Sequence, residues 1–331
     1  MPRCLFCLRD NDELTDEHVF PAALGGDLVV KGTCVECVKD KRSFSKEFEQ
    51  PLAMELAPLR NLLVIPDRYG KMPNVAAKAE MNGKELDAKL LGDGTVQLTP
   101  VVTVMRGKDG EVKEILYQHV TEKQKENNRR DAAEKGYELI ESEPAAGQQA
   151  EISVAGTLKL IGAPEGLRLA TKIAYTGFAL VMGGEFAIRN ASDEVRAYVR
   201  TGDGTPTANL FFNEEYLANC AQGMHQHSLV LTGRKDKRRI DAIVRLFGAL
   251  CYFVTLSKEY DGADFYNTLV YDAQRGKTDG VLVAHLQSEF LQIEHVATSA
   301  ATIWNDSAVS GTRLMEFIEK EIQARLRAGG N

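Results

Sequence analysis

The sequence contains little that would favour a membrane protein or a protein that coats nucleic acid. It has no hydrophobic run of about 18 residues, the length that a membrane-spanning helix needs. Its formal net charge is −7, with 40 lysines and arginines against 47 aspartates and glutamates. Because bulk charge of this sign repels a polyanion, contact with DNA would depend on local basic patches.

Signatures of several enzyme classes are also missing. The chain has no Walker phosphate-binding loop, no dinucleotide-binding glycine fingerprint and no nucleophile elbow. The N-terminal stretch MPRCLFC has no apolar segment of the kind that an export signal needs, so we expect a cytoplasmic protein whose thiols stay reduced. Its 331 residues are 44% hydrophobic and 26% charged, which fits a globular protein of two or three units.

Cysteine is scarce, with six residues, but four of them form two closely spaced CxxC pairs near the N-terminus. Two such pairs on either side of a short polar segment predict a tetrahedral zinc site. The four expected ligands are Cys4, Cys7, Cys34 and Cys37. Disulfides and isolated thioredoxin-like pairs are the alternatives, and a reducing compartment disfavours disulfides. Cys220 and Cys251 lie far apart in apolar segments and are expected to be free, buried thiols.

Between the two pairs the chain reads EHVFPAALGG over residues 17–26. The zinc spacing combined with an EHxxPxxLGG run resembles the Cys4-type HNH endonucleases over residues 4–50. The resemblance implies a ββα-metal finger, in which a short hairpin is followed by a helix. It also implies that His18 is the general base for water attacking a DNA phosphodiester. Glu17 would then bind a catalytic divalent cation, Mg²⁺ or Mn²⁺.

Elementary chemistry supports these two roles. Histidine has a pKa near 7, which suits a general base, and a hard cation prefers oxygen ligands such as a carboxylate. The alternative is that Glu17 and His18 form an ordinary polar turn beside a structural zinc site.

One position departs from the family pattern. HNH proteins of this type usually have asparagine directly after the last cysteine as a second metal ligand, but here the residue is Val38. Asp40 is the next oxygen donor at the start of the following helix and is the candidate replacement. Three functions therefore remain open. The chain could be a DNA endonuclease, for instance in defence against foreign DNA, a catalytically degenerate finger that binds DNA or protein, or a structural zinc domain that serves a C-terminal ligand sensor.

Two basic clusters are candidates for phosphate contacts, although a solvated surface explains each of them equally well. The first is at the start of a helix predicted over 39–56 and comprises Lys39, Lys41, Arg42 and Lys46. The second, which we name the basic turn, spans 234–239 between two predicted strands and comprises Arg234, Lys235, Lys237, Arg238 and Arg239. His225 and His227 lack a third nearby ligand, so a surface or core role is expected for them.

The remaining pattern predicts an α+β protein with three parts. These are an HNH-like zinc domain over 1–57, named the finger below, a β-rich hairpin region with a charged helix over 58–145, and an α+β recognition or regulatory region over 146–331. The last region is also where a protein partner or a second copy of the chain would bind.

Several elements follow from periodicity and turn residues. Strands are expected over 60–120, with two-residue hairpin turns at Asn82-Gly83, Asp93-Gly94 and Asp109-Gly110. Helices are expected at 121–136, 165–184, 192–201 and 310–330. Antiparallel strands are expected from 227 to 257, with two more after them.

Overall fold

A computed structural model describes most of the chain. The described residues are 2–35, 37, 44–81, 84–93, 95–98, 102–106, 109, 112–117, 122–135, 151–153, 159–211, 225–274, 281–284 and 320. By their contacts, residues 1–72 and 157–331 form one compact unit and residues 73–156 form a second. This grouping differs from the predicted three parts, because the finger and the C-terminal region share one hydrophobic core. The mixture of helices and antiparallel sheets confirms the α+β class.

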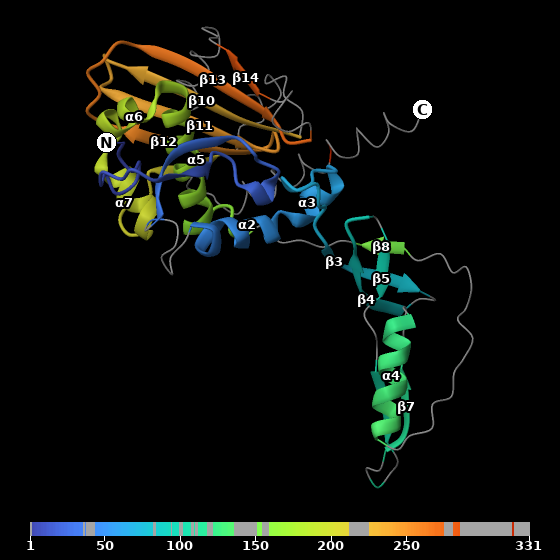
Figure 1. Ribbon diagram of the computed structural model, residues 1–331. Coiled ribbons are helices and arrows are strands. Elements are labelled where there is room, and N and C mark those ends of the chain that lie inside the picture. Colours follow the sequence, from blue (N-terminus) through green and yellow to red (C-terminus); the bar gives the residue numbers. More distant parts are fainter. Residues whose placement is uncertain are drawn as a thin grey trace. The chain divides into compact units, whose positions relative to one another are not determined.

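The first unit begins with the hairpin and helix that the finger was expected to form (Figure 1). The hairpin consists of β1 (Leu14–His18) and β2 (Val29–Cys34), joined through the short 3-10 turn η1 (Ala22–Leu24). The helical part comprises the π-helical segment η2 (Ser45–Glu49), α2 (Gln50–Glu55) and α3 (Ala57–Leu62). The predicted helix over 39–56 is thus present from Phe44 onward, and its start lies outside the described residues.

A β-bulge interrupts the hairpin directly before the Glu-His pair. Thr15 pairs with Thr33 but Asp16 pairs with Lys31, so Gly32 is the extra residue of β2. A Cβ on Gly32 would lie 2.4 Å from Leu5 Cδ1, so this close approach requires glycine. The bulge bends the hairpin just before Glu17 and His18.

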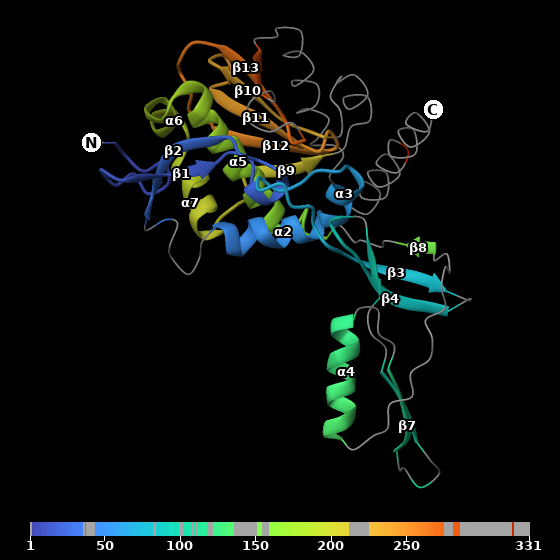
Figure 2. The same cartoon turned by 45° about the vertical axis from the view of Figure 1, so that its right-hand side comes forward.

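A long buried helix connects the finger to a sheet. Helix α5 (Pro164–Met182) matches the helix expected at 165–184 and is buried on nearly all sides. It packs against β2 and η2 of the finger and against the strands of the large sheet, as Figures 1 and 2 show. A Cβ on Gly177 would lie 2.1 Å from Leu229 Cδ2 and 3.4 Å from Val19 Cγ1, so only glycine lets the three segments approach this closely.

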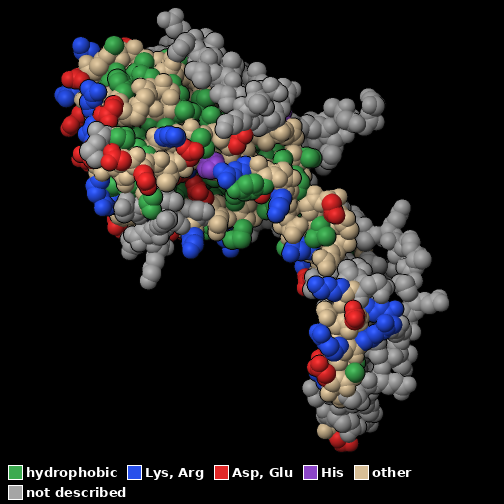
Figure 3. All heavy atoms as spheres, in the orientation of Figure 1, with side chains coloured by type: hydrophobic (Ala, Val, Ile, Leu, Met, Phe, Trp, Pro, Cys, Tyr) green, Lys and Arg blue, Asp and Glu red, His purple; other side chains and the backbone are tan. Residues whose placement is uncertain are grey.

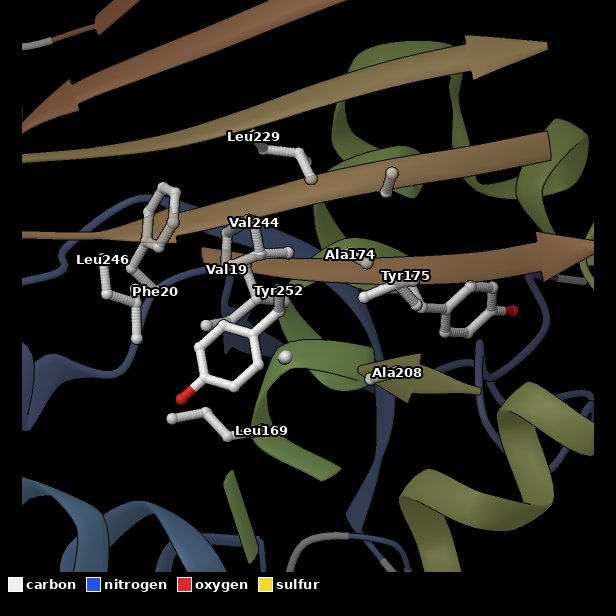
Figure 4. Packing of buried hydrophobic residues seen from close by; sticks show 14 of the residues in the cluster. Val19, Phe20, Leu169, Ala174, Tyr175, Ala208, Leu229, Val244, Leu246 and Tyr252 are labelled. Atoms are coloured by element: carbon white, nitrogen blue, oxygen red, sulfur yellow. The ribbon is translucent and has the colours of Figure 1, made fainter. Parts of the chain in front are cut away.

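The large sheet has six antiparallel strands in the order β14-β13-β10-β11-β12-β9. Their bounds are β9 (Ala208–Phe211), β10 (Gln226–Arg234), β11 (Arg239–Leu246), β12 (Leu250–Ser257), β13 (Phe265–Asp272) and β14 (Val281–Ala284). The predicted strands are confirmed, and the basic turn joins β10 to β11. Figure 4 shows Val19 and Phe20 of the finger in one cluster with α5 and sheet side chains.

Two short helices complete the described core of the first unit. They are α6 (Gly184–Asn190) and α7 (Asp193–Thr201), and the second confirms the helix expected at 192–201. The Ser192 hydroxyl caps α7 by accepting a hydrogen bond from the Val195 N–H. Among the described helices, none combines the length and the apolar character that crossing a bilayer would require.

The second unit contains the hairpins and the charged helix expected there. A four-stranded antiparallel sheet has the order β5-β4-β3-β8, and a separate hairpin pairs β6 with β7. The bounds are β3 (Val75–Met81), β4 (Lys84–Leu90), β5 (Val96–Leu98), β6 (Val102–Arg106), β7 (Val112–Tyr117), α4 (Glu122–Glu134) and β8 (Glu151–Ser153).

The expectation of strands from residue 60 was wrong at its start, because α3 continues to Leu62 and the first strand begins at Val75. Pro58 lies in the first turn of α3, where a missing N–H costs nothing. A two-residue connection is confirmed only for Asn82-Gly83, since Met81 pairs with Lys84. The other two hairpins close over longer loops, with Leu90 opposite Val96 and Arg106 opposite Val112. The helix expected at 310–330, apart from the helical Lys320, and Cys220 lie outside the described residues.

Candidate metal centre and nuclease cleft

The two CxxC pairs meet at one point, as the sequence predicts. Cys4 Sγ lies 3.8 Å from Cys37 Sγ, and Cys7 Sγ lies 3.5 Å from Cys34 Sγ. All four sulfur atoms lie within 4.8 Å of one another. Four thiolates at about 2.3 Å from a tetrahedral zinc are roughly 3.8 Å apart, so this donor set fits zinc. In the described part of the chain, no other group of three or more cysteine, histidine or carboxylate side chains is arranged to hold a metal.

The surroundings of the sulfur atoms favour a thiolate. The pKa of Cys4 is lowered to about 4, first by the hydrogen bond that it shares with Cys37 and against the effect of burial. The Cys34 N–H also points at Cys4 Sγ, at 3.4 Å. The pKa of Cys37 is raised in turn, first by the same hydrogen bond and then by burial. A metal ion would replace that shared proton.

A cleft of about 590 Å³ opens in the first unit. Its lining comes from the end of β1, the turn η1, the η2–α2 junction and the loop after α3. The residues are Asp16, Glu17, His18, Ala22, Ala23, Phe44, Glu49, Gln50, Asp67, Arg68 and Tyr69. Figure 3 shows a histidine on one face of the molecule, with basic, acidic and hydrophobic side chains beside it. Both adjacent residues of the Glu-His pair line this cavity, at the end of β1 that follows the bulge.

A fully buried lysine of α5 contacts both residues of the Glu-His pair. The Lys172 ammonium lies 2.6 Å from Oε1 of Glu17 and 2.8 Å from Oε1 of Glu49. It also donates a hydrogen bond to the backbone carbonyl of His18. Three oxygen atoms therefore surround the cation, which is the arrangement that a buried ammonium requires.

Burial and these charges shift the pKa values of the group. The pKa of Glu17 is raised, first by burial and also by Glu49, although Lys172 opposes the shift. For Lys172, burial is the largest influence and lowers the pKa, but Glu17 and Glu49 together outweigh it and the net shift is upward. Lys172 is therefore charged. The Thr33 hydroxyl lowers the pKa of Glu17 slightly, although its geometry falls short of a regular hydrogen bond.

His18 is held in its neutral form. Arg68 Nη1 lies 2.7 Å from His18 Nε2, and because a guanidinium can only donate, Nε2 is the acceptor. The pKa of His18 is lowered by burial first, and then by the positive charges of Lys172 and Arg68. A neutral imidazole with an unprotonated nitrogen at the cleft is the form that a general base needs.

The described residues of the two basic clusters do not line this cleft. Lys46 is exposed on η2 and does not line the cleft, whereas Lys39, Asp40, Lys41 and Arg42 lie outside the described residues. In the basic turn, Arg234 pairs with Asp236 and Arg239 pairs with Asp241. The turn closes the far end of the β10–β11 hairpin, about 23 Å along the strand from His227, which contacts the finger.

The two C-terminal histidines have different surroundings. His227 is fully buried, where Nε2 donates to the Leu24 carbonyl at 3.0 Å and Nδ1 accepts from the Phe247 N–H at 3.2 Å. His225 lies 3.4 Å from an Asp272 oxygen. Cys251 is buried, as expected.

Sequence reasoning missed three residues of the site, namely Glu49, Arg68 and Lys172. Lys172 had one recognisable signal, since it is a lysine within the largely apolar helix predicted at 165–184. A charged residue there must find a partner when the helix is buried. Arg68 and Glu49 carry no such signal, because charged residues outside a motif are usually solvated.

Comparison with known proteins agrees with the geometry of the finger. Residues 4–53 match the family model described as HNH endonuclease, over about 15% of the chain. This segment is therefore an HNH endonuclease domain, and its cysteine cluster can hold zinc. No curated protein and no solved structure is significantly similar to the chain.

Proposed function

We propose that the protein is a metal-dependent endonuclease that hydrolyses DNA phosphodiester bonds. The observation that carries the proposal is that Glu17 and His18 line one cleft in the HNH segment, which also contains a cysteine cluster suited to zinc. The zinc would be structural, held by the four cysteines, and would supply folding energy to the finger.

His18 acts as the general base in this proposal. Water attacks the phosphorus atom, and its proton passes to the electron pair of His18 Nε2, which Arg68 occupies in the ligand-free cleft. A bond forms between the water oxygen and phosphorus while the bond from phosphorus to the 3′ oxygen breaks, and the electron pair leaves with that oxygen. The lowered pKa of His18 keeps the imidazole unprotonated near neutral pH.

Glu17 would hold the catalytic divalent cation. Its carboxylate lines the cleft, and oxygen donors suit Mg²⁺ or Mn²⁺, although one oxygen is already paired with Lys172. Asp40 is the proposed second ligand, because Val38 cannot bind a metal. When bound, the cation would stabilise negative charge on the phosphate and on the leaving oxygen. The chain itself orients Glu17 through Lys172 and the β-bulge.

The remaining regions would serve substrate selection. In the proposal the finger helix, including Lys46, meets the DNA backbone, and the C-terminal region recognises the substrate, a protein partner or a second copy of the chain. A role in defence against foreign DNA fits a nuclease domain joined to a larger recognition region.

The test is cleavage of plasmid and phage DNA with Mg²⁺ or Mn²⁺ by the wild type and by His18→Ala. Loss of a positioned base costs about 10²–10⁴-fold in rate, so His18→Ala should stop cleavage while zinc content and DNA affinity persist. His225→Ala, which alters a histidine outside the cleft, is the control. A wild type that cuts no DNA with either metal would overturn the proposal.

The second candidate is a degenerate finger that binds DNA or protein without chemistry. It is favoured by Val38 and by the ion pair that occupies one oxygen of Glu17. Val38→Asn and Asp40→Ala separate the two functions. Cleavage that appears only in Val38→Asn would favour the degenerate finger, whereas an active wild type whose Asp40→Ala variant needs more Mg²⁺ would support the nuclease and its second ligand.

A further inference from the structure

The loop after α3 presents one arginine at the mouth of the cleft from a tightly fixed backbone. Asp67 closes the loop, since its carboxylate accepts from the N–H groups of Tyr69 at 2.8 Å and Lys71 at 2.9 Å. The Arg68 N–H itself donates to the Ala22 carbonyl of η1 at 3.2 Å. The position of Arg68 relative to the Glu-His pair is therefore fixed by main-chain hydrogen bonds.

The guanidinium of Arg68 donates its hydrogen bonds to acceptors that carry no negative charge. It donates from Nη1 to His18 Nε2 at 2.7 Å and from Nη2 to the Tyr69 hydroxyl at 2.5 Å. Both acceptors are neutral, and in the described part of the chain no carboxylate pairs with Arg68. Asp67 is the nearest in sequence, but its side chain is engaged with the backbone of the loop. The side chain is exposed and lines the cleft.

An anionic ligand with two acceptor oxygens would satisfy this guanidinium better than an imidazole does. Arginine donors form a planar fork that matches a phosphate, and charge-assisted hydrogen bonds of this kind are roughly twice as strong as neutral ones. The hydrogen bond to His18 also occupies the electron pair that a general base needs. Without a ligand, the electron pair of His18 Nε2 is therefore occupied, and the positive charge of Arg68 is paired only with neutral acceptors.

We infer that Arg68 binds a phosphate of the nucleic-acid strand in the cleft and, by moving to it, releases His18 Nε2 for catalysis. This inference rests on the proposed endonuclease function and names the residue that anchors its substrate. Binding of the nucleic-acid strand is then coupled to release of the general base His18, so that water is not activated while the cleft is empty.

Tyr69 is the positioning residue for this movement. Its ring lies 4.6 Å from the Arg68 guanidinium carbon and its hydroxyl holds Nη2. The tyrosine is 71% exposed, so its ring supports the guanidinium at the surface of the cleft rather than filling the core. The guanidinium of Arg68 can rotate over the Tyr69 ring while the backbone of the loop stays in place.

The experiment measures binding of a short DNA duplex to the full-length, zinc-loaded protein without Mg²⁺ or Mn²⁺, at several salt concentrations. Arg68→Gln should weaken binding about tenfold or more and reduce the salt slope by about one, as expected for one lost phosphate contact. Arg68→Lys should keep most of the slope but not the full affinity, because a lysine offers no fork. Arg189→Gln, an exposed arginine outside the cleft, is the matched control and should bind like the wild type.

A second readout follows the release of His18 directly. With ¹⁵N-labelled histidine, the His18 Nε2 signal should move when the duplex is added to the wild type. In Arg68→Gln the free protein should already lack the hydrogen bond, so the same addition should change the signal far less. Circular dichroism and zinc content check that the variants are folded.

The outcomes separate this inference from the nuclease proposal. Equal affinity and equal salt slopes for the wild type and Arg68→Gln would overturn the inference, while cleavage that depends on His18 would still support the nuclease. Binding that depends on Arg68 without any cleavage would support the anchor and overturn the nuclease. A wild type that binds no duplex at any salt concentration would overturn the inference, whatever the cleavage assay gives.

Discussion

The Lys172 ammonium lies 2.6 Å from Oε1 of Glu17, which joins a fully buried cation of α5 to the HNH motif. Because the same ammonium also contacts Glu49 and the carbonyl of His18, the geometry of the motif depends on a residue more than 150 positions away in the chain. The finger is therefore not an independent module, and removing this lysine tests that dependence.

Lys172→Met should destabilise the first unit by about 3–5 kcal/mol, because it leaves two buried carboxylates without a counter-charge. Urea unfolding measures the change, and Lys235→Met, at an exposed lysine, is the control. Adding Glu49→Gln should restore part of the loss by removing one of the uncompensated charges. A Lys172→Met protein as stable as the control would show that the cation is not needed.

Cys37→Ser should remove the zinc, of which elemental analysis should find about one ion per wild-type chain. The finger shares its core with α5 and the large sheet, and the Tyr175 hydroxyl bonds the Leu5 carbonyl at 2.7 Å. Loss of zinc should therefore lower the unfolding midpoint of the whole first unit. Cys251→Ser, at a buried cysteine outside the cluster, should keep the metal. An ordered, metal-free wild type would contradict the zinc assignment.

His227 should make stability depend on pH. Burial lowers its pKa from 6.5 to about 4, so as the pH falls the unfolded chain takes up a proton before the native protein does. The contribution of His227 to native stability is therefore full above pH 6.5 and decreases down to about pH 4, by roughly 1.4 kcal/mol per pH unit. His227→Gln should flatten this part of the profile. Parallel profiles for the wild type and His227→Gln would contradict this assignment.

The basic turn tests whether phosphate contacts extend beyond the cleft. Lys237 and Arg238 are exposed in the basic turn, so the charge offered to DNA is expected to come from them. Replacing both with glutamate should flatten the salt dependence of DNA affinity if the turn meets the backbone. The matched control replaces the exposed Arg189 and Arg200 with glutamate. An unchanged slope would make the turn a solvated hairpin.

The sequence by itself determined the local chemistry of the finger. The CxxC spacing predicts the cysteine cluster, and the EHxxPxxLGG run identifies Glu17 and His18, two of the residues that line the cleft, because both patterns extend over only a few residues. The largely apolar run at 165–184 likewise predicts α5, the Ser192 cap predicts α7, and apolar runs predict the strands of the large sheet, which are buried almost throughout.

Tertiary structure decided what surrounds that chemistry. In the sequence, Lys172 is one charge in an apolar helix. Only the packing of that helix between the finger and the sheet places it beside Glu17 and Glu49. In the sequence, Arg68 is an ordinary loop residue. Only the packing of the loop after α3 against η1 brings its guanidinium within hydrogen-bond distance of His18. These contacts join segments far apart in sequence, and no local propensity or spacing encodes them. They exist because one shared core holds the finger, α5 and the sheet together.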